Sequence, residues 1–174
     1  MSPHTARALD TATLEYVLQD DPLLVFGGVF AYDRIPNCVT KYPCGYVFNT
    51  DRSDEPGEHW VSVYFGEDRK GEYFCPLGTE PYGALYEFMK KNSISTVYNK
   101  TMIQFPLSSL CGYYCVYHLK RAARGYSITR TLNDFRYRDK RKNDAKVFAW
   151  VRREVLKRRR NGQQRGRRQT KTKL

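Results

Sequence analysis

A cysteine followed by a glycine stands at the start of a predicted helix in the second half of the chain. Cys111 comes after the loop 106–109, and the apolar residues around and beyond it predict a helix over 110–124. A thiol in that position meets unpaired backbone N–H groups and the positive end of the helix dipole, and both favour the nucleophilic thiolate. Gly112 allows the backbone to approach a substrate closely. Buried cysteines are also common in ordinary cores, so Cys111 and Cys115 alone are weak evidence for catalysis.

The chain has three histidines, so a base for that thiol can be sought by elimination. His118 lies on the same predicted helix two turns beyond Cys111, at about 10 Å, which is too far for direct proton transfer and indicates a structural role. His4 lies near the start of the chain. His59 opens a predicted strand directly after a glycine-containing loop, where catalytic side chains are often displayed. His59 is therefore the predicted base.

A glutamine seven residues before Cys111 adds a third component. Gln104 carries a side-chain amide donor. Together with the backbone N–H of Cys111, that amide would form an oxyanion hole for a tetrahedral intermediate. The order His59, Gln104, Cys111 therefore predicts acyl-transfer chemistry at a thiol.

The elements that must position these residues are short strands and helices without regular alternation. Predicted helices cover residues 5–19, 82–91, 110–124 and 144–159, and predicted strands cover residues 23–30, 45–49, 59–65, 72–75 and 101–104. This mixture predicts an α+β domain with a small mixed sheet flanked by helices.

Length and charge limit the possible architectures. The 174 residues suffice for one domain, and 41% hydrophobic with 28% charged residues is a globular composition. No apolar run reaches the roughly 20 residues of a membrane span, and the first residues lack the apolar core of a secretory signal. The five cysteines are expected to be thiols. Cys38 and Cys44 lack the partners of a zinc site, so no metal is expected.

Several motifs in this order resemble the adenovirus maturation protease family, or adenain, within the wider Ulp/SENP clan. The motifs are His59-Trp60, Tyr73-Phe74-Cys75-x-x-Gly78 and Gln104-x6-Cys111-Gly112. Segments 28–33, 43–50, 111–115 and 143–144 are similar to the adenain-like proteases of Polinton/Maverick elements and adintoviruses. The resemblance spans about residues 25–155 and implies an adenain/Ulp-like fold.

The resemblance implies a cysteine endopeptidase that processes viral or transposon structural precursors. Cys111 would attack the scissile carbonyl, and His59 would hold the thiolate as an ion pair and later protonate the leaving amine. Gln104 and the backbone N–H of Cys111, with Gly112 beside it, would stabilise the oxyanion. Trp60 would pack beside His59 and exclude water, and it can serve as an ordinary core aromatic at the same time.

Cys75 departs from the family, because relatives have an acid at this position. That acid accepts a hydrogen bond from the histidine ring, and losing it costs a serine protease about 10⁴ in rate. Three interpretations are open. Cys75 orients His59 weakly in a slower enzyme; a nearby acid, Glu72, Glu80 or Asp68, substitutes; or the protein is a degenerate copy. By strand alternation Glu72 points to the side opposite Cys75, which makes it a poor candidate.

The basic residues are concentrated at the C-terminal end. The net charge is +12, and residues 157–174 contain nine of the 30 Lys and Arg and no acid. The sequence therefore predicts a protease domain over residues 1–156 and a disordered basic tail over 157–174. The tail suits nucleic-acid phosphates without base-specific contacts, through Lys157, Arg158, Arg159, Arg160, Arg165, Arg167 and Arg168. A solvated tail without a partner is the plainer alternative.

The resemblance also supplies expectations about cofactors and location. It implies DNA and a viral peptide as activators, and a monomer that works in the virion and the host nucleus. Two rival functions remain. One is a catalytically impaired fold that binds DNA or protein, suggested by Cys75; the other is a SUMO- or ubiquitin-type deconjugase, disfavoured by the short chain and the adenain-like hairpin.

Overall fold

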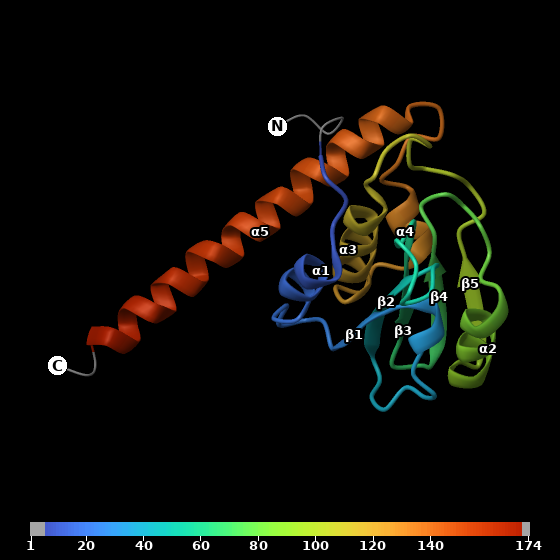
Figure 1. Ribbon diagram of the computed structural model, residues 1–174, viewed down its shortest axis with the longest axis horizontal. Coiled ribbons are helices and arrows are strands. Elements are labelled where there is room, and N and C mark those ends of the chain that lie inside the picture. Colours follow the sequence, from blue (N-terminus) through green and yellow to red (C-terminus); the bar gives the residue numbers. More distant parts are fainter. Residues whose placement is uncertain (1–5, 172–174) are drawn as a thin grey trace.

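The computed structural model describes residues 6–171 and shows a five-stranded mixed sheet with helices on both faces (Figure 1). The strands lie side by side in chain order, as β1 (Phe26–Phe30), β2 (Cys44–Asn49), β3 (Trp60–Phe65), β4 (Lys70–Phe74) and β5 (Ser95–Tyr98). The three central strands are antiparallel, whereas the edge strands β1 and β5 pair in parallel with β2 and β4. The predicted small mixed sheet flanked by helices is confirmed.

The helices divide between the two faces of the sheet. They are α1 (Thr11–Leu18), α2 (Gly83–Asn92), α3 (Cys111–Ala122), α4 (Ile128–Leu132) and α5 (Lys140–Lys171), with a short 3-10 helix at Tyr32–Arg34. α3 packs on β3 and contacts α1, α4 and α5. α2 contributes Phe88 and other apolar residues to a second core on the opposite face.

Side-chain alternation in the strands builds these two cores. In β2, Val47 belongs to the core under α3, and the next residue, Phe48, belongs to the core under α2. Phe74 and Tyr73 of β4 divide between the two cores in the same way. Because both faces are covered, all six residues of β2 are buried and its sequence shows no polar alternation. Cys75, directly after β4, lies in the core under α2.

One strand prediction was wrong. Residues 101–104 form no strand, and the fifth strand is β5 at Ser95–Tyr98. β5 is an edge strand whose first three residues are exposed, so it lacks the apolar pattern of a buried strand. In the 101–104 segment, the backbone N–H groups of Ile103 and Gln104 instead donate to the carbonyl of Pro76, at 2.9 and 3.1 Å.

Both ends of the chain also differ from the predicted elements. α1 begins at Thr11, because the carboxylate of Asp10 caps it by accepting from the backbone N–H of Thr13 at 2.8 Å. The predicted helical residue 5 and His4 lie outside the described residues. Within residues 6–171, none of the helices is long and apolar enough to cross a membrane.

α5 is much longer than the sequence predicted. We expected a helix to residue 159 and a disordered tail over 157–174, whereas the backbone is helical to Lys171. Buried Val147, Phe148 and Val151 anchor the helix on the core. Beyond them Arg, Lys and Gln have high helix propensity and no proline interrupts the stretch, so the helix propagates. Figure 1 shows its last turns extending away from the sheet. Residues 172–174 lie outside the described part.

Candidate active site

The predicted histidine and the cysteine at the family's acid position meet at one end of the sheet. His59 directly precedes β3 and Cys75 directly follows β4. Because these strands are antiparallel neighbours, the start of one lies beside the end of the other. The Nε2 atom of His59 lies 3.2 Å from the Sγ atom of Cys75. The structure therefore places Cys75 where it can orient the imidazole.

Cys75 is fully buried and held by two neighbours that the sequence alone did not indicate. The hydroxyl of Thr79 donates to its Sγ at 3.0 Å. The side chain of Asn99 holds its backbone: the amide oxygen accepts from the N–H of Cys75 at 2.9 Å, and the amide nitrogen donates to its carbonyl at 2.5 Å. Asn99 is itself buried, so the position of the sulfur is rigidly defined.

The three acids considered as substitutes for the missing carboxylate are engaged elsewhere. Glu72 accepts from the backbone N–H of Ile128 at 2.9 Å. Glu80 accepts from the hydroxyl of Tyr98 at 2.9 Å, and Asp68 pairs with Lys70 at 2.7 Å. Among the contacts of the described residues, none joins these carboxylates to His59, and Cys75 is the side-chain partner of its ring.

A different carboxylate acts on His59 through its charge. Burial lowers the pKa of His59 to about 4, and the charge of Asp51 partly opposes that effect. Asp51 follows β2, where its carboxylate accepts from the backbone N–H of Glu58 at 2.9 Å. The sequence did not indicate Asp51, because its proximity to His59 depends on pairing between residues after β2 and residues before β3. In that stretch the backbone N–H of Thr50 donates to the carbonyl of His59 at 2.9 Å.

Cys111 is the first residue of α3, as predicted, and it is 5% exposed. Burial raises the pKa of its thiol, and hydrogen bonds from the backbone of Trp60, Gly112 and Cys111 itself act in the opposite direction. The helix start therefore favours the thiolate as expected, but the cost of burying a charge is larger. The raised pKa of the thiol and the lowered pKa of His59 both oppose a thiolate–imidazolium pair.

Gln104 is buried beside the helix that carries Cys111. Its amide nitrogen donates to the carbonyl of Ser108 at 2.6 Å. An amide nitrogen carries two hydrogens, so one donor remains for an oxyanion. The amide oxygen of Gln104 is buried and lacks a hydrogen-bond partner among the described residues. The amide is thus placed by one contact and has capacity for another.

Two buried residues at the start of α5 hold the backbone on either side of Gln104. The side-chain nitrogen of Asn143 donates to the carbonyl of Ile103 at 2.9 Å. The carboxylate of Asp144 accepts from the backbone N–H of Phe105 at 3.3 Å and from the hydroxyl of Tyr114 at 2.8 Å. The segment 103–105 is therefore anchored to α5 and α3 by side chains rather than by strand pairing.

Gly78 explains why a glycine ends the hairpin motif. Its N–H donates to the carbonyl of Cys75 at 2.8 Å, and its φ of 76° is in the region that favours glycine. A β-carbon there would lie 2.6 Å from the backbone carbon of Thr101. The missing side chain lets the Cys75 turn pack directly on the segment that leads to Gln104.

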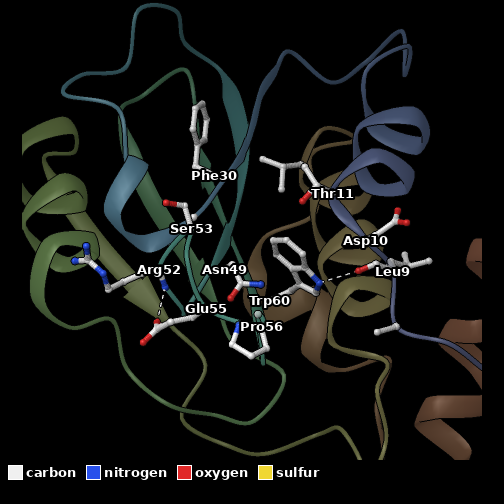
Figure 2. Close-up of a pocket in the computed structure, with 14 residues that line it drawn as sticks. Leu9, Asp10, Thr11, Phe30, Asn49, Arg52, Ser53, Glu55, Pro56 and Trp60 are labelled. Atoms are coloured by element: carbon white, nitrogen blue, oxygen red, sulfur yellow. Dashed lines mark hydrogen bonds between the residues drawn. The ribbon is translucent and has the colours of Figure 1, made fainter.

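Trp60 and Gly112 pack together next to the nucleophile. The indole nitrogen of Trp60 donates to the carbonyl of Leu9 at 2.8 Å (Figure 2). A β-carbon on Gly112 would lie 3.3 Å from the Trp60 ring and 3.1 Å from the β-carbon of Leu9. Gly112 thus allows Trp60 and the segment before α1 to close over the start of α3.

A pocket of about 420 Å³ is lined in part by Trp60. Figure 2 shows Phe30, Asn49 and Pro56 around it, with the segment 8–11 along one wall. It combines the indole and apolar residues with polar groups such as Arg52 and Glu55. A polypeptide lying across the site could place a side chain here.

His118 was predicted to be structural, and the remaining predicted site residues are the basic ones near the end of α5. His118 is fully buried, stacks on Phe74 and lies 2.9 Å from the hydroxyl of Ser62, as a structural histidine would. Of the seven basic residues predicted to bind nucleic acid, Lys157 contacts Glu154 at 3.1 Å and Arg158 pairs with Asp20. The other five side chains lie outside the described ones: Arg159, Arg160, Arg165, Arg167 and Arg168.

The cysteines and acids give no sign of a metal centre in the described part of the chain. All five cysteines are free thiols, and Cys38 and Cys44 belong to no cluster. Within residues 6–171, no group of three or more His, Cys, Asp or Glu side chains lies together so as to hold a metal ion.

One known viral protease is similar in sequence to part of this chain. No family model matches the chain. Cysteine protease S273R of African swine fever virus, isolate Tick/Malawi/Lil 20-1/1983, is 26% identical over 112 residues, which cover 55% of this chain and 40% of the viral protein. The chain therefore spans less than half the length of this relative.

Two solved structures are similar to this chain. The SUMO protease Ulp1, with its catalytic cysteine oxidized to a sulfinic acid, superposes with a TM-score of 0.50 at 13% identity, covering 88% of this chain and 81% of Ulp1. A crystal structure of the African swine fever virus pS273R protease has a TM-score of 0.45 at 23% identity, covering 57% of this chain and 42% of the viral chain. The likeness to Ulp1 establishes a shared fold.

Proposed function

We propose that this chain is a cysteine endopeptidase. The observation that carries the proposal is the assembly at one end of the sheet of the His59–Cys75 contact at 3.2 Å and the helix-start thiol of Cys111. Gln104 lies on the loop before α3, with one amide hydrogen unused. The 26% sequence identity to a viral cysteine protease over 112 residues supports the same class of reaction.

The contact with Cys75 supports separate tasks for the two nitrogens of His59. Nε2 faces the sulfur of Cys75, and in the tautomer with its hydrogen on Nε2, Nδ1 carries the free lone pair. Nδ1 would accept the thiol proton as Cys111 attacks the substrate carbonyl, and it would return the proton to the leaving amine. Gln104 and the backbone N–H of Cys111 would stabilise the oxyanion. Water would then hydrolyse the thioester and regenerate the thiol.

The test is cleavage of a synthetic library of randomised peptides, read by mass spectrometry. Wild-type protein should cleave, and both Cys111→Ala and His59→Ala should abolish cleavage. Cys115→Ala is the matched control, because this second cysteine of α3 is also buried but has no proposed chemical role. Cleavage that survives Cys111→Ala would exclude the proposal.

The substrates we propose are structural precursor polypeptides of a virus or transposon, since the curated relative is a viral cysteine protease. The motifs of the hairpin and of the helix start support adenain-like specificity over that of a deconjugase. A monomer of this kind would act in the virion and the host nucleus. A ubiquitin-like protein with a C-terminal electrophile is the probe for the rival: its reaction with Cys111 would favour a deconjugase.

DNA assistance belongs to the same proposal and depends on the basic end of α5. Arg165, Arg167 and Arg168 lie on the part of this helix that extends from the body. Neutralising these three arginines to glutamine should weaken retention on duplex DNA and flatten its salt dependence. Cleavage of precursors should lose its acceleration by DNA in the same variant. A viral peptide activator would act additively with DNA in that assay.

The second candidate is an impaired protease fold that survives as a DNA- or protein-binding module. Cys75 in place of an acid, together with the lowered pKa of His59, favours it. Under this alternative Cys111 reacts with alkylating agents at an ordinary rate, and no peptide is cleaved. Turnover that depends on both His59 and Cys111 would exclude it.

A further inference from the structure

A basic pocket borders the loop that carries Gln104. It is lined by Met102, Phe105 and Pro106 on one side and by Arg138, Asp139, Lys140 and Arg141 on the other, and its volume is about 440 Å³. The loop and the start of α5 form its two walls. We call it the basic pocket.

Three cations and one carboxylate line this pocket, and that carboxylate is already engaged. Asp139 accepts from the backbone N–H of Lys142 at 3.2 Å and pairs with its ammonium group at 2.8 Å. Arg138 is exposed, and within residues 6–171 no carboxylate pairs with it. The guanidinium of Arg141 lies 4.6 Å from the centre of the Phe105 ring. The pocket therefore has a net positive charge that the protein does not neutralise.

The basic pocket is held at a constant position relative to the catalytic loop. Phe105 follows Gln104 directly, so their Cα atoms are about 3.8 Å apart. Asn143 and Asp144 bond the backbone on both sides of Gln104, and they belong to the same helix that carries Arg141. An extended substrate advances about 3.3 Å per residue, so a side chain only a few residues from the scissile bond would reach this pocket.

We propose that the basic pocket binds an acidic side chain of the substrate close to the scissile bond. The inference rests on the proposed endopeptidase function and adds a substrate class to it. Polypeptide is favoured over nucleic acid because the pocket is concave, has an aromatic and thioether wall from Phe105 and Met102, and adjoins the loop that would hold the reacting carbonyl. A carboxylate would pair with Arg138 and Arg141 while its carbon chain contacts the Phe105 ring.

The experiment compares cleavage sites in the randomised peptide library. Wild-type cleavage sites should be enriched in Asp and Glu at one position a few residues from the scissile bond, by about threefold to tenfold. The double variant Arg138→Glu with Arg141→Glu should lose that enrichment and favour Lys or Arg there. Peptides that are neutral at this position should be cleaved at nearly the wild-type rate. Arg138→Glu alone should show about half of the effect on a logarithmic scale, and it leaves the contact with Phe105 intact.

Lys90→Glu with Lys91→Glu is the matched control, because these exposed lysines end α2 on the other face of the sheet. It should leave the enrichment unchanged. Cysteine-dependent cleavage without acidic enrichment, or with enrichment that the double variant retains, would overturn the inference while the protease function stands. Absence of any cleavage dependent on Cys111 would remove the function itself. Loss of DNA retention in the double variant, with unchanged cleavage preference, would assign the pocket to nucleic acid instead.

Discussion

Replacing Cys75 with aspartate should increase the activity of this protein. The Cys75→Asp carboxylate would occupy the site of a sulfur that now lies 3.2 Å from Nε2 of His59 and accepts from the Thr79 hydroxyl at 3.0 Å. Both contacts would become charge-assisted hydrogen bonds. The substitution adds two heavy atoms to a fully buried position, so a loss of stability is expected as well.

The size of the increase follows from the protonation state of the site. Burial holds the pKa of His59 at about 4 in the present structure. A carboxylate in direct contact shifts a neighbouring pKa by roughly 1 to 3 and here would raise it. The population of the thiolate–imidazolium pair depends on the difference between the pKa values of His59 and Cys111. It should therefore rise by about 10- to 1,000-fold, since each pKa unit is a factor of ten.

The assay is the rate of Cys111 alkylation by iodoacetamide as a function of pH, followed by mass spectrometry, together with kcat/KM on a cleaved peptide. Both quantities should rise in Cys75→Asp near neutral pH. Cys75→Asn is the matched control, because it has the same shape without the charge. If the aspartate and asparagine variants reacted equally fast, the reasoning that a missing charge limits this site would be refuted.

Three further predictions concern the support of the site. Asn143→Ala should weaken the binding of a peptide aldehyde inhibitor about tenfold, because the hemithioacetal that the aldehyde forms with Cys111 needs the oxyanion hole of Gln104. The rate of Cys111 alkylation by iodoacetamide should stay at the wild-type value. Equal losses in inhibitor binding and in alkylation would indicate general unfolding. Gly112→Ala should lower the free energy of unfolding by about 1–3 kcal/mol in chemical denaturation, since the new methyl would press on neighbours 3.1 and 3.3 Å away. The half-buried His59 should also make stability depend on pH. Because its pKa falls from 6.5 to about 4 on folding, the unfolded chain binds its proton first, and stability should drop by about 3 kcal/mol as pH falls from 6.5 to 4. His59→Phe should remove that component of the acid sensitivity, and an unchanged pH profile would contradict the assignment.

The pKa shifts of Cys111 and His59 also bear on how activation would occur. Both pKa directions oppose the ion pair, because burial penalises the charged forms of Cys111 and His59 alike. Charge near His59 is the available remedy, and Asp51 supplies part of it. A substrate or activator that brings negative charge near His59, or opens Cys111 to water, would therefore favour the reactive form.

Local features of the sequence were enough to predict the candidate nucleophile, its histidine and the glutamine. A cysteine at a helix start, a histidine at a strand start and a glutamine seven residues before that cysteine can each be read within about ten residues. The four strands with apolar patterns and the helices that carry buried stripes were predicted for the same reason, since burial dictates their side-chain period.

Other features depend on residues far apart in the chain. β5 is exposed and pairs only because β4 offers an edge, while residues 103–105 are bonded by Pro76, Asn143 and Asp144 instead of by a strand. The extension of α5 beyond its predicted end at residue 159 follows a polar stretch without an apolar period, so the pattern did not predict it. These contacts leave no local period in the sequence.

The protonation of the site is likewise a property of the folded molecule alone. The sequence determined that a thiol, an imidazole and an amide were available in a workable order, and that the usual acid was absent. Only the tertiary structure decided that Cys75 contacts the imidazole, that the charge of Asp51 acts on it, and that burial shifts the pKa values of both reactive groups against the ion pair. The physical reason is that pKa values depend on burial and on neighbouring charges, and neither exists until distant segments pack together.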